Sequence, residues 1–449
     1  MSQYRLDTEI QKGAGASFFI SVASAGLVFF AHLWLARWMG EAEYGLLAYL
    51  FSYINILVVP STLGLVISAQ RFLPGYLALG KVADMRGFLS FSIRTSFWLA
   101  VFLGLGWAAV MWLTRGSGLP DSFQWALAGG VILLILAATG SIMAATLRAF
   151  RHVISSQGPQ GMLEPVLLLL LACILFQTSG RLDAGKAMGC KVFAAFTALV
   201  ILAGLLRKYS PPELAGTKGD ARERRKWLDA SFFLFIITAC HMAMSQTGTI
   251  LAGALTGPEE AGVFFVCEKI ATISAFVLIA FNYIGAPKMA ALWTLKDMRQ
   301  LRNLIGSLTP RIFLLTLPIA LGLVVFSRSI LGLFGPGFIR GWPVLVLLVT
   351  GHVICTCTGT VGSLLVMTGH QKKCVPPILT CAVMNVGLAA LGILLWGLPG
   401  AALAWTVSVV VCNGWFVMLA YRILRINTTV FQVNAWGRQS YRAGVEKEE

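Results

Sequence analysis

The chain has 449 residues, of which 57% are hydrophobic and only 12% are charged, and its formal net charge is +16. A soluble globular protein carries about 25% charged residues, so this composition excludes that class. The hydrophobic residues fall in blocks of about 20 or more, the length that a helix needs to cross about 30 Å of hydrocarbon. The sequence therefore predicts an all-α polytopic membrane protein.

From the N-terminus onward, the apolar blocks predict about twelve transmembrane helices joined by short loops. The first is expected to be an uncleaved anchor, because no small-residue cleavage site follows it. The predicted spans are 16–36, 44–69, 88–113, 122–147, 162–178, 186–206, 229–255, 262–285, 306–330, 342–367, 375–396 and 399–421. The polar stretch after the sixth span divides the chain. We therefore expect an N-terminal six-helix bundle (1–206), a cytoplasmic basic linker (207–228), a C-terminal six-helix bundle (229–423) and a cytoplasmic tail (424–449).

Basic residues alternate between the predicted loops. With the N-terminus in the cytoplasm, the cytoplasmic segments hold 25 Lys and Arg residues and the outer loops hold 6. Because cytoplasmic loops carry the excess of Lys and Arg, both termini are predicted to be cytoplasmic. The positive charge is then mainly this topology signal, and we expect no nucleic-acid partner. The basic cluster at Arg222–Lys226 is interpreted as a solvated loop or as a contact for anionic lipid head groups.

A short internal repeat relates the two halves. GEAEYG (Gly40–Gly45) and GPEEAG (Gly257–Gly262) share the pattern G-x-x-E-x-G at an offset of 217 residues. At the same offset, Arg94 in the third span corresponds to Arg311 in the ninth. Two parallel six-span halves are typical of transporters in which two bundles rock around a central cavity.

Seven stretches, spread over nearly the whole chain, form a further pattern. They are LARWMGEAEYGLLAY (Leu35–Tyr49), LRAFRHV (Leu147–Val153), LTGPEEAGVFFVCEKIA (Leu255–Ala271), GAP (Gly285–Pro287), LGLFGPGF (Leu331–Phe338), VMTGHQKK (Val366–Lys373) and LPGAALA (Leu398–Ala404). In this order they resemble the polysaccharide-biosynthesis flippases, the O-antigen and exopolysaccharide branch of the multidrug/oligosaccharidyl-lipid/polysaccharide exporter (MOP) superfamily.

The resemblance implies a MATE-like, V-shaped pair of six-helix bundles that works by alternating access in the bacterial inner membrane. It implies a cargo of polyprenyl-diphosphate-linked oligosaccharide, moved from the cytoplasmic to the periplasmic leaflet. Membrane lipids and the polysaccharide polymerase and export machinery are the other partners it suggests. We expect a monomer, because one chain supplies both halves.

The seventh span departs from the family pattern. Many relatives have an aspartate there, in a pattern like Q-x-D-x-x-x-x-G. The matching stretch Gln246–Gly253 has Gly248 in that place. If the acid takes part in ion coupling in relatives, coupling here would have to differ.

Ionisable residues inside predicted spans are candidate site residues, because each costs about 2.5–3.5 kcal/mol to insert. Four are cations, and Glu268 is the one carboxylate expected at depth, because Glu164 is placed at the cytoplasmic mouth of the fifth span as a helix-start residue. The candidates for a cationic, substrate-binding cavity are Arg94, Arg311, Lys269 and Lys191, and those for coupling or a polar cavity contact are Glu268 and His241. Cations suit a diphosphate head group.

Each candidate has a simpler interpretation. The two arginines could form a ring at the inner mouth of the cavity or extend to lipid head groups, as could Lys191 at the outer end. Lys269 could face the cavity or pair locally with Glu268. His241 could be a helix-contact residue rather than a proton carrier.

Other functional classes find less support. A cation-coupled multidrug exporter of the same superfamily is the alternative, disfavoured by the scarcity of deep carboxylates. The sequence carries no catalytic motif in a usable context, so we expect no enzyme. The C-x-C at Cys355 and Cys357 has no further ligand at metal-binding spacing, so we expect no metal and no cofactor.

Overall fold

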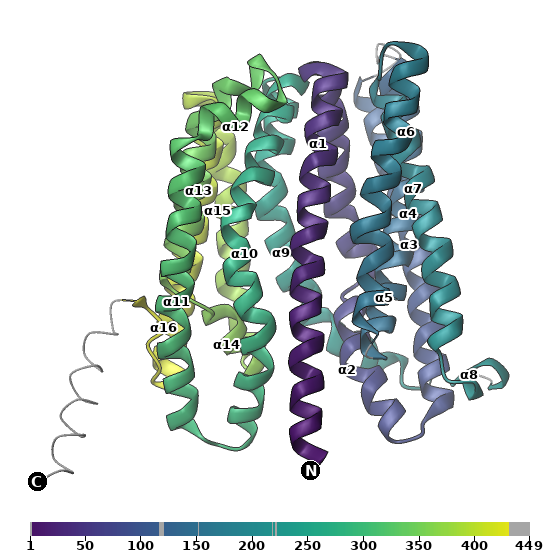
Figure 1. Ribbon diagram of the computed structural model, residues 1–449, viewed down its shortest axis with the longest axis vertical. Coiled ribbons are helices and arrows are strands. Elements are labelled where there is room, and N and C mark those ends of the chain that lie inside the picture. Colours follow the sequence, from purple (N-terminus) through teal and green to yellow (C-terminus); the bar gives the residue numbers. More distant parts are fainter. Residues whose placement is uncertain (1, 116–120, 151, 218, 221, 431–449) are drawn as a thin grey trace, which may run out of the picture. The chain divides into compact units, whose positions relative to one another are not determined.

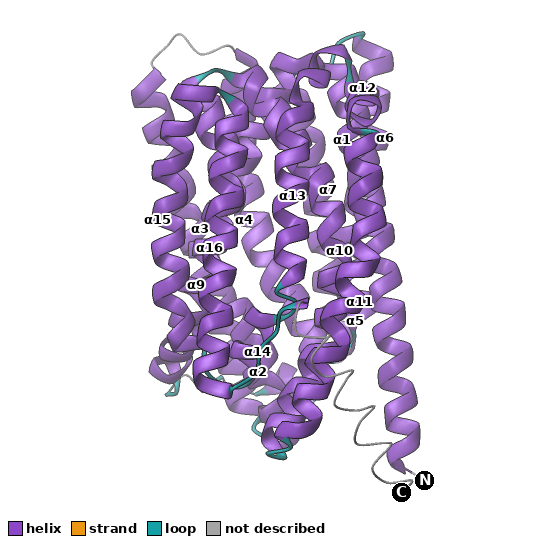
Figure 2. Cartoon of the chain, turned by 90° about the vertical axis from the view of Figure 1, so that its left-hand side faces the viewer, coloured by secondary structure: helices purple, strands orange, loops and turns teal. Residues whose placement is uncertain are grey.

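The computed structural model describes residues 2–115, 121–150, 152–217, 219–220 and 222–430, and the regular structure within these ranges is entirely helical (Figures 1 and 2). The elements are α1 (Ser2–Thr62), α2 (Leu65–Ala78), α3 (Val82–Arg115), α4 (Asp121–Ala149), α5 (Val153–Gly158), the π-helix η2 (Pro159–Leu163), α6 (Glu164–Ser179), α7 (Ala184–Tyr209), α8 (Glu213–Gly216), α9 (Arg224–Leu255), α10 (Pro258–Thr294), α11 (Met298–Val325), α12 (Ser327–Phe334), the 3₁₀ helix η3 (Pro336–Gly341), α13 (Trp342–Cys357), α14 (Val361–Met367), α15 (Gln371–Trp396) and α16 (Leu398–Leu424).

Eleven of the described helical segments are long and apolar enough to cross a membrane. The first of them contains two predicted spans, because Gly40 leaves the helical conformation with φ 77° and divides α1 into two arms. The predicted all-α polytopic fold is therefore confirmed.

Several predicted spans differ from the structure in their limits, and the second and fifth are examples. The second ends at Thr62, because Leu63 and Gly64 both take positive φ before α2 begins. The fifth begins earlier than predicted, since the helical segment Ile154–Ser179 is continuous through η2.

Contacts divide the helices into two compact units. The first unit comprises Met1–Val266 and Gly332–Phe338, and the second comprises Cys267–Leu331 and Ile339–Glu449. Helix α9, which begins the predicted C-terminal bundle, contacts α1 and α2 in the first unit. The division into bundles on either side of a linker at 207–228 stays a prediction.

In the first unit, α4 packs against α7, α3 and α1, and α1 packs against α9. In the second unit, α16 packs against α15 and α13, and α13 packs against α11. Span ten is broken between α13 and α14, where Gly359 has φ +60° and lies against the Thr309 side chain of α11. Serine and threonine hydroxyls inside the helices commonly donate to a carbonyl one turn earlier, as Thr146 does to Ile142 at 2.9 Å.

The segment before α9 is docked onto the first unit. The Tyr76 hydroxyl of α2 donates to Glu223 Oε2 at 2.6 Å and accepts from Trp227 Nε1 at 2.7 Å. Trp227 is fully buried. The Asp220 amide donates to the Ala83 carbonyl at 2.9 Å. The part of the predicted linker closest to α9 is therefore held by α2 and α3.

The repeated G-x-x-E-x-G pattern has the same structural use in both copies. Its first glycine has positive φ, 77° at Gly40 and 114° at Gly257. Its last glycines are in contact, since a Cβ at Gly262 would lie 3.0 Å from Gly45 Cα and one at Gly45 would collide with the Pro258 carbonyl. All four positions belong to the first unit. The two copies therefore meet where only glycine fits.

We expect Gly45→Ala to destabilise the protein by about 1–3 kcal/mol, the usual cost of overpacking, because the colliding Pro258 carbonyl is backbone. Gly26→Ala, in the same helix, meets nothing within 4 Å and is the matched control. Thermal unfolding in detergent should show a lower midpoint for Gly45→Ala alone. Equal midpoints for the two variants would contradict the close approach.

Tyr76→Phe should change the alkaline stability. Burial, followed by the hydrogen bond to Glu223, raises the pKa of Tyr76 from 10.0 to about 12. The folded state therefore favours the neutral phenol, and the resulting stability is present below pH 10 and lost as the pH rises toward 12. Unfolding midpoints measured across this range should converge for wild type and Tyr76→Phe. A constant difference between them would contradict this hydrogen-bonded docking.

Candidate functional site

A π-helical segment interrupts the fifth span. η2 covers Pro159–Leu163, between α5 and α6. Pro159 and Pro165 both lack an N–H, so the carbonyls one turn before each proline lose their usual donor. Single π-helical turns inside α-helices are often found at functional sites. This segment is therefore the first place to look for a site in the first unit.

Glu164 directly follows the π-helix and forms an ion pair inside the span. Its Oε1 lies 2.6 Å from Lys191 Nζ of α7, and the side chains are 12% and 25% exposed. At 1.5 Å per residue, Glu164 lies about 15 Å from Ile154, the first residue of the span. Glu164 therefore lies within the helical segment Ile154–Ser179 rather than at its start, where it was expected, and Glu268 as the one deep carboxylate stays a prediction.

The polar content of the segment explains the error. Two glycines and two glutamines precede Glu164 (Gln157, Gly158, Gln160 and Gly161), and such a stretch is typical of a loop. In the structure Gln160 and Gly161 face neighbouring helices instead. A Cβ at Gly161 would lie 2.5 Å from Ser24 Oγ of α1, and one at Gly140 of α4 would lie 2.7 Å from Gln160 Nε2.

Ser24, Gln157, Gln160, Glu164 and Lys191 are called here the π-segment cluster. Gln160 and Glu164 are four residues apart, as are Gln157 and Gly161, so side chains of neighbouring turns lie close together. Ser24 Oγ and Gln157 Oε1 are buried and have no hydrogen-bond partner among the described residues. The cluster therefore contains one ion pair and additional oxygen atoms that are able to accept hydrogen bonds or coordinate a cation.

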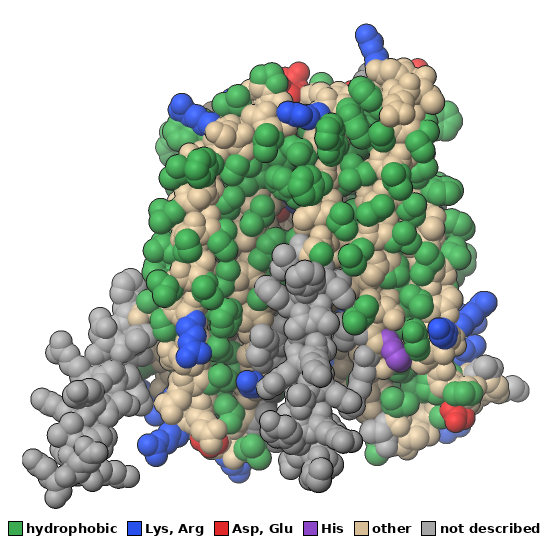
Figure 3. All heavy atoms as spheres, in the orientation of Figure 1, with side chains coloured by type: hydrophobic (Ala, Val, Ile, Leu, Met, Phe, Trp, Pro, Cys, Tyr) green, Lys and Arg blue, Asp and Glu red, His purple; other side chains and the backbone are tan. Residues whose placement is uncertain are grey.

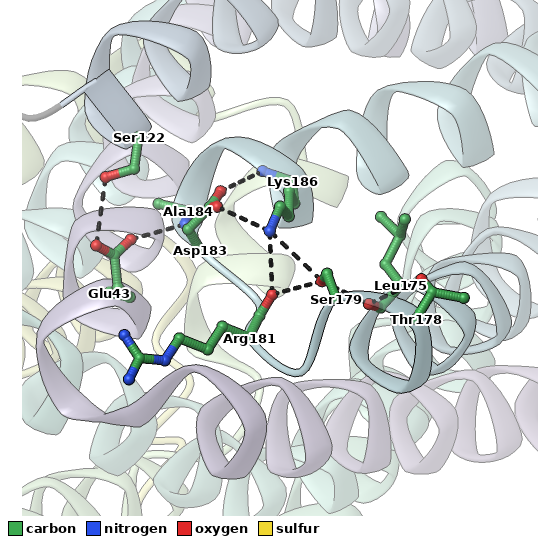
Figure 4. A network of polar contacts seen from close by, with 9 residues as sticks. All are labelled: Glu43, Ser122, Leu175, Thr178, Ser179, Arg181, Asp183, Ala184 and Lys186. Carbon is green, nitrogen blue, oxygen red and sulfur yellow. Dashed lines mark hydrogen bonds and ion pairs between the residues drawn. The ribbon is translucent and has the colours of Figure 1, made fainter.

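A second polar network joins Glu43 of α1 to the starts of α4 and α7 (Figure 4). Glu43 accepts hydrogen bonds from the Ala184 amide at 2.7 Å and from Ser122 Oγ at 3.3 Å. Asp183 caps α7 through the Lys186 amide at 2.8 Å and pairs with the Lys186 ammonium at 3.4 Å. Carboxylates at a helix N-terminus are stabilising, so this network is sufficiently explained as the anchor of α7.

Arg94 and Arg311 occupy equivalent positions on exposed helix faces. Arg94 shares its face of α3 with the exposed Phe97 and Trp98, and Arg311 shares its face of α11 with the exposed Leu314 and Leu315. Neither guanidinium forms an ion pair within the described part of the chain. Apolar faces of this kind suit lipid tails, which favours extension to the head groups. Their role in a cavity stays a prediction.

Helices α9 and α10 carry the other candidates. Glu268 and Lys269 are partly buried in the second unit, and their roles in a cavity or in a local pair stay predictions. His241 is exposed on α9 in the first unit. The structure pairs Lys191 with Glu164 and brings no other predicted candidates together within the described residues of the first unit.

Packing explains why a glycine occupies position 248. A Cβ there would collide with the ring of Phe264, which is 2% exposed. An aspartate at this position would need the Phe264 side chain to move. The acid of the family pattern is therefore replaced by a tight contact between α9 and α10.

The surface also agrees with a membrane protein. The face in Figure 3 carries hydrophobic side chains along the helices, and most of its Lys and Arg side chains lie toward the two ends. Among the described residues, no group of three or more His, Cys, Asp and Glu could hold a metal ion.

Solved structures identify the fold. The chain aligns with a multidrug resistance MATE-family transporter of the MOP superfamily in an inward-facing conformation, at 13% identity, a TM-score of 0.73, and coverage of 94% of this chain and 99% of the other. The fold is that of MATE-family transporters. A MOP-superfamily transporter from Pyrococcus furiosus, described as having a binding pocket of reversed polarity that suggests a different function, aligns at 15% identity and a TM-score of 0.62, with 93% and 95% coverage.

A Vibrio cholerae MATE transporter aligns at 16% identity and a TM-score of 0.59, with 92% and 98% coverage. No protein-family model matches the sequence, and no curated protein matches it. The likeness to solved structures therefore establishes the MATE-type fold, and the substrate has to be argued from this chain's own residues.

Proposed function

We propose that the protein is a transporter that moves a lipid-linked oligosaccharide, linked through a polyprenyl diphosphate, from the cytoplasmic to the periplasmic leaflet of a bacterial inner membrane. The MATE-type fold supports the transporter class, because the solved structures that share it are transporters. The seven stretches of flippase-like sequence support the saccharide cargo. Both termini lie in the cytoplasm in this proposal, as the loop charges indicate.

The observation that carries the proposal is the sign of the charges inside the spans. Of the four predicted cations, Lys191 pairs with Glu164 and Lys269 is adjacent in sequence to Glu268, while Arg94 and Arg311 form no ion pair in the described part of the chain. The balance is therefore still positive after Glu164 is counted. A diphosphate brings two or more negative charges, and Arg and Lys are the side chains that bind phosphate oxygens most strongly. Its glycan would then be carried to the polymerase and export machinery.

Cation-coupled export of small molecules is a second candidate. The observation that favours it is the depth of Glu164, because a carboxylate within a span is the group that a coupled exporter would use to bind a cation or a proton. The ammonium of Lys191 already neutralises that carboxylate, so the first proposal is preferred.

The saccharide proposal predicts that cells lacking the protein accumulate a polyprenyl-diphosphate oligosaccharide in their membranes. Mass spectrometry of membrane lipid extracts measures this directly. The intact chain should clear the intermediate, and Arg94→Ala/Arg311→Ala should clear it several-fold more slowly if the two arginines contact the diphosphate.

Arg86→Ala/Arg302→Ala is the matched control, because both residues are exposed arginines near the starts of the same two helices. It should behave as the intact chain does. Unchanged lipid pools in the deletion strain, together with new sensitivity to cationic dyes, would contradict the saccharide cargo and support the exporter. If Arg94→Ala/Arg311→Ala and Arg86→Ala/Arg302→Ala clear the intermediate equally fast, Arg94 and Arg311 do not contact the diphosphate. Contact with lipid head groups is then their remaining interpretation.

A further inference from the structure

We propose that Lys191 is a built-in counter-cation: its ammonium occupies a position in the π-segment cluster that a free monovalent cation would take in its absence. This inference concerns the group that neutralises the Glu164 carboxylate, and it does not depend on which cargo is transported.

A lone carboxylate in the place of Glu164 would destabilise the fold. Glu164 is 12% exposed and lies well inside the span Ile154–Ser179. A buried carboxylate that has lost its partner is strongly destabilising, so something positive has to neutralise it. Lys191 does so at 2.6 Å, from another helix and with little exposure of its own.

Other oxygen atoms of the π-segment cluster have the chemistry of cation ligands. Ser24 Oγ and Gln157 Oε1 are buried oxygens with no hydrogen-bond partner in the described part of the chain. Pro165 leaves the carbonyl one turn before it without its usual donor. Alkali cations are hard ions that prefer carboxylate, hydroxyl, amide and carbonyl oxygens, and freed helix carbonyls coordinate Na⁺ in other membrane proteins. Ser24 Oγ faces Gly161, three residues before Glu164, and Gln157 precedes Glu164 by seven residues on the same helical segment.

A second lysine on α7 forms a more exposed ion pair. Lys186 also pairs with a carboxylate, Asp183, but at 3.4 Å and with side chains 40% and 37% exposed. Water neutralises such a surface pair when one partner is removed, so it contributes little. Water has less access to Glu164, whose side chain is only 12% exposed, so it does not replace Lys191 in this way. Removal of Lys191 should leave the Glu164 carboxylate without its counter-charge.

The test uses the purified full-length chain in detergent, with choline chloride replaced by NaCl at constant ionic strength. Six proteins are compared: wild type, Lys191→Met, Lys191→Gln, Glu164→Gln, Lys191→Met/Glu164→Gln and the control Lys186→Met. Binding of ²²Na⁺ is measured by equilibrium dialysis, and the unfolding midpoint is measured in both salts. We expect Lys191→Met to bind about one saturable Na⁺ per chain and to show a higher midpoint in NaCl, as expected when a ligand binds the folded state.

Wild type and Lys186→Met should show neither effect, and neither should the double variant, because its carboxylate is gone. A folded Lys191→Met that binds no Na⁺ would overturn the proposal, since Glu164 would then have taken up a proton instead. Na⁺ binding by wild type that Glu164→Gln abolishes would overturn it as well. Should Lys191→Met be recovered folded only in NaCl, the proposal is supported. Should neither it nor Lys191→Gln fold in either salt, the proposal is overturned, because Na⁺ has not replaced the ammonium.

Discussion

The absence of water in the hydrocarbon region governs this structure more than any other single constraint. Each backbone N–H and C=O within a span has to be paired inside the chain, and helices are the local solution. Hydroxyl groups obey the same rule, as when Thr139 donates to the Ile135 carbonyl one turn earlier. The most demanding case is a charge. The Glu164–Lys191 pair meets the constraint by joining two helices at 2.6 Å.

The same constraint explains which features could be predicted from the sequence. Hydrophobic blocks are long and few residues interrupt them, so the existence of the spans is predictable, while several of their limits differ from the helices by five or more residues. The G-x-x-E-x-G repeat also corresponds to a structural requirement. Glycine is needed for the positive φ at Gly40 and Gly257 and for the close contact between Gly45 and Gly262. These are local demands of the backbone, and they are visible in the residues themselves.

The errors arose where a polar residue is satisfied by a distant one. Glu164 looked like a helix-start residue because its partner Lys191 is remote in sequence and the residues before it resemble a loop. The hydrogen bonds that join Tyr76 to Glu223 and Trp227 could not be predicted either, because a basic, polar stretch is typical of a solvated linker. Hydrophobicity reports where a residue lies along the membrane normal; it does not report which helix lies beside it.

Ion pairing also decides which charged residues are available to bind a substrate. A charge already neutralised by the chain is less available to a substrate, so Lys191 becomes a weaker candidate for binding a diphosphate than its depth alone suggested. Arg94 and Arg311 form no ion pair in the described part of the chain, yet their apolar surroundings suit lipid contact. Intramembrane charges thus have to be sorted by partner before they are assigned to a cargo.

The central claim is that Glu164 and Lys191 stabilise the fold as a pair, and a double-mutant cycle tests it most directly. The unfolding free energies of wild type, Glu164→Gln, Lys191→Met and the double variant would be measured in choline chloride. The account predicts that the double variant loses less stability than the two single variants combined, with a coupling of about 0.5–3 kcal/mol. Losses that add to within about 0.5 kcal/mol would mean that the two charges are neutralised independently, and would contradict it.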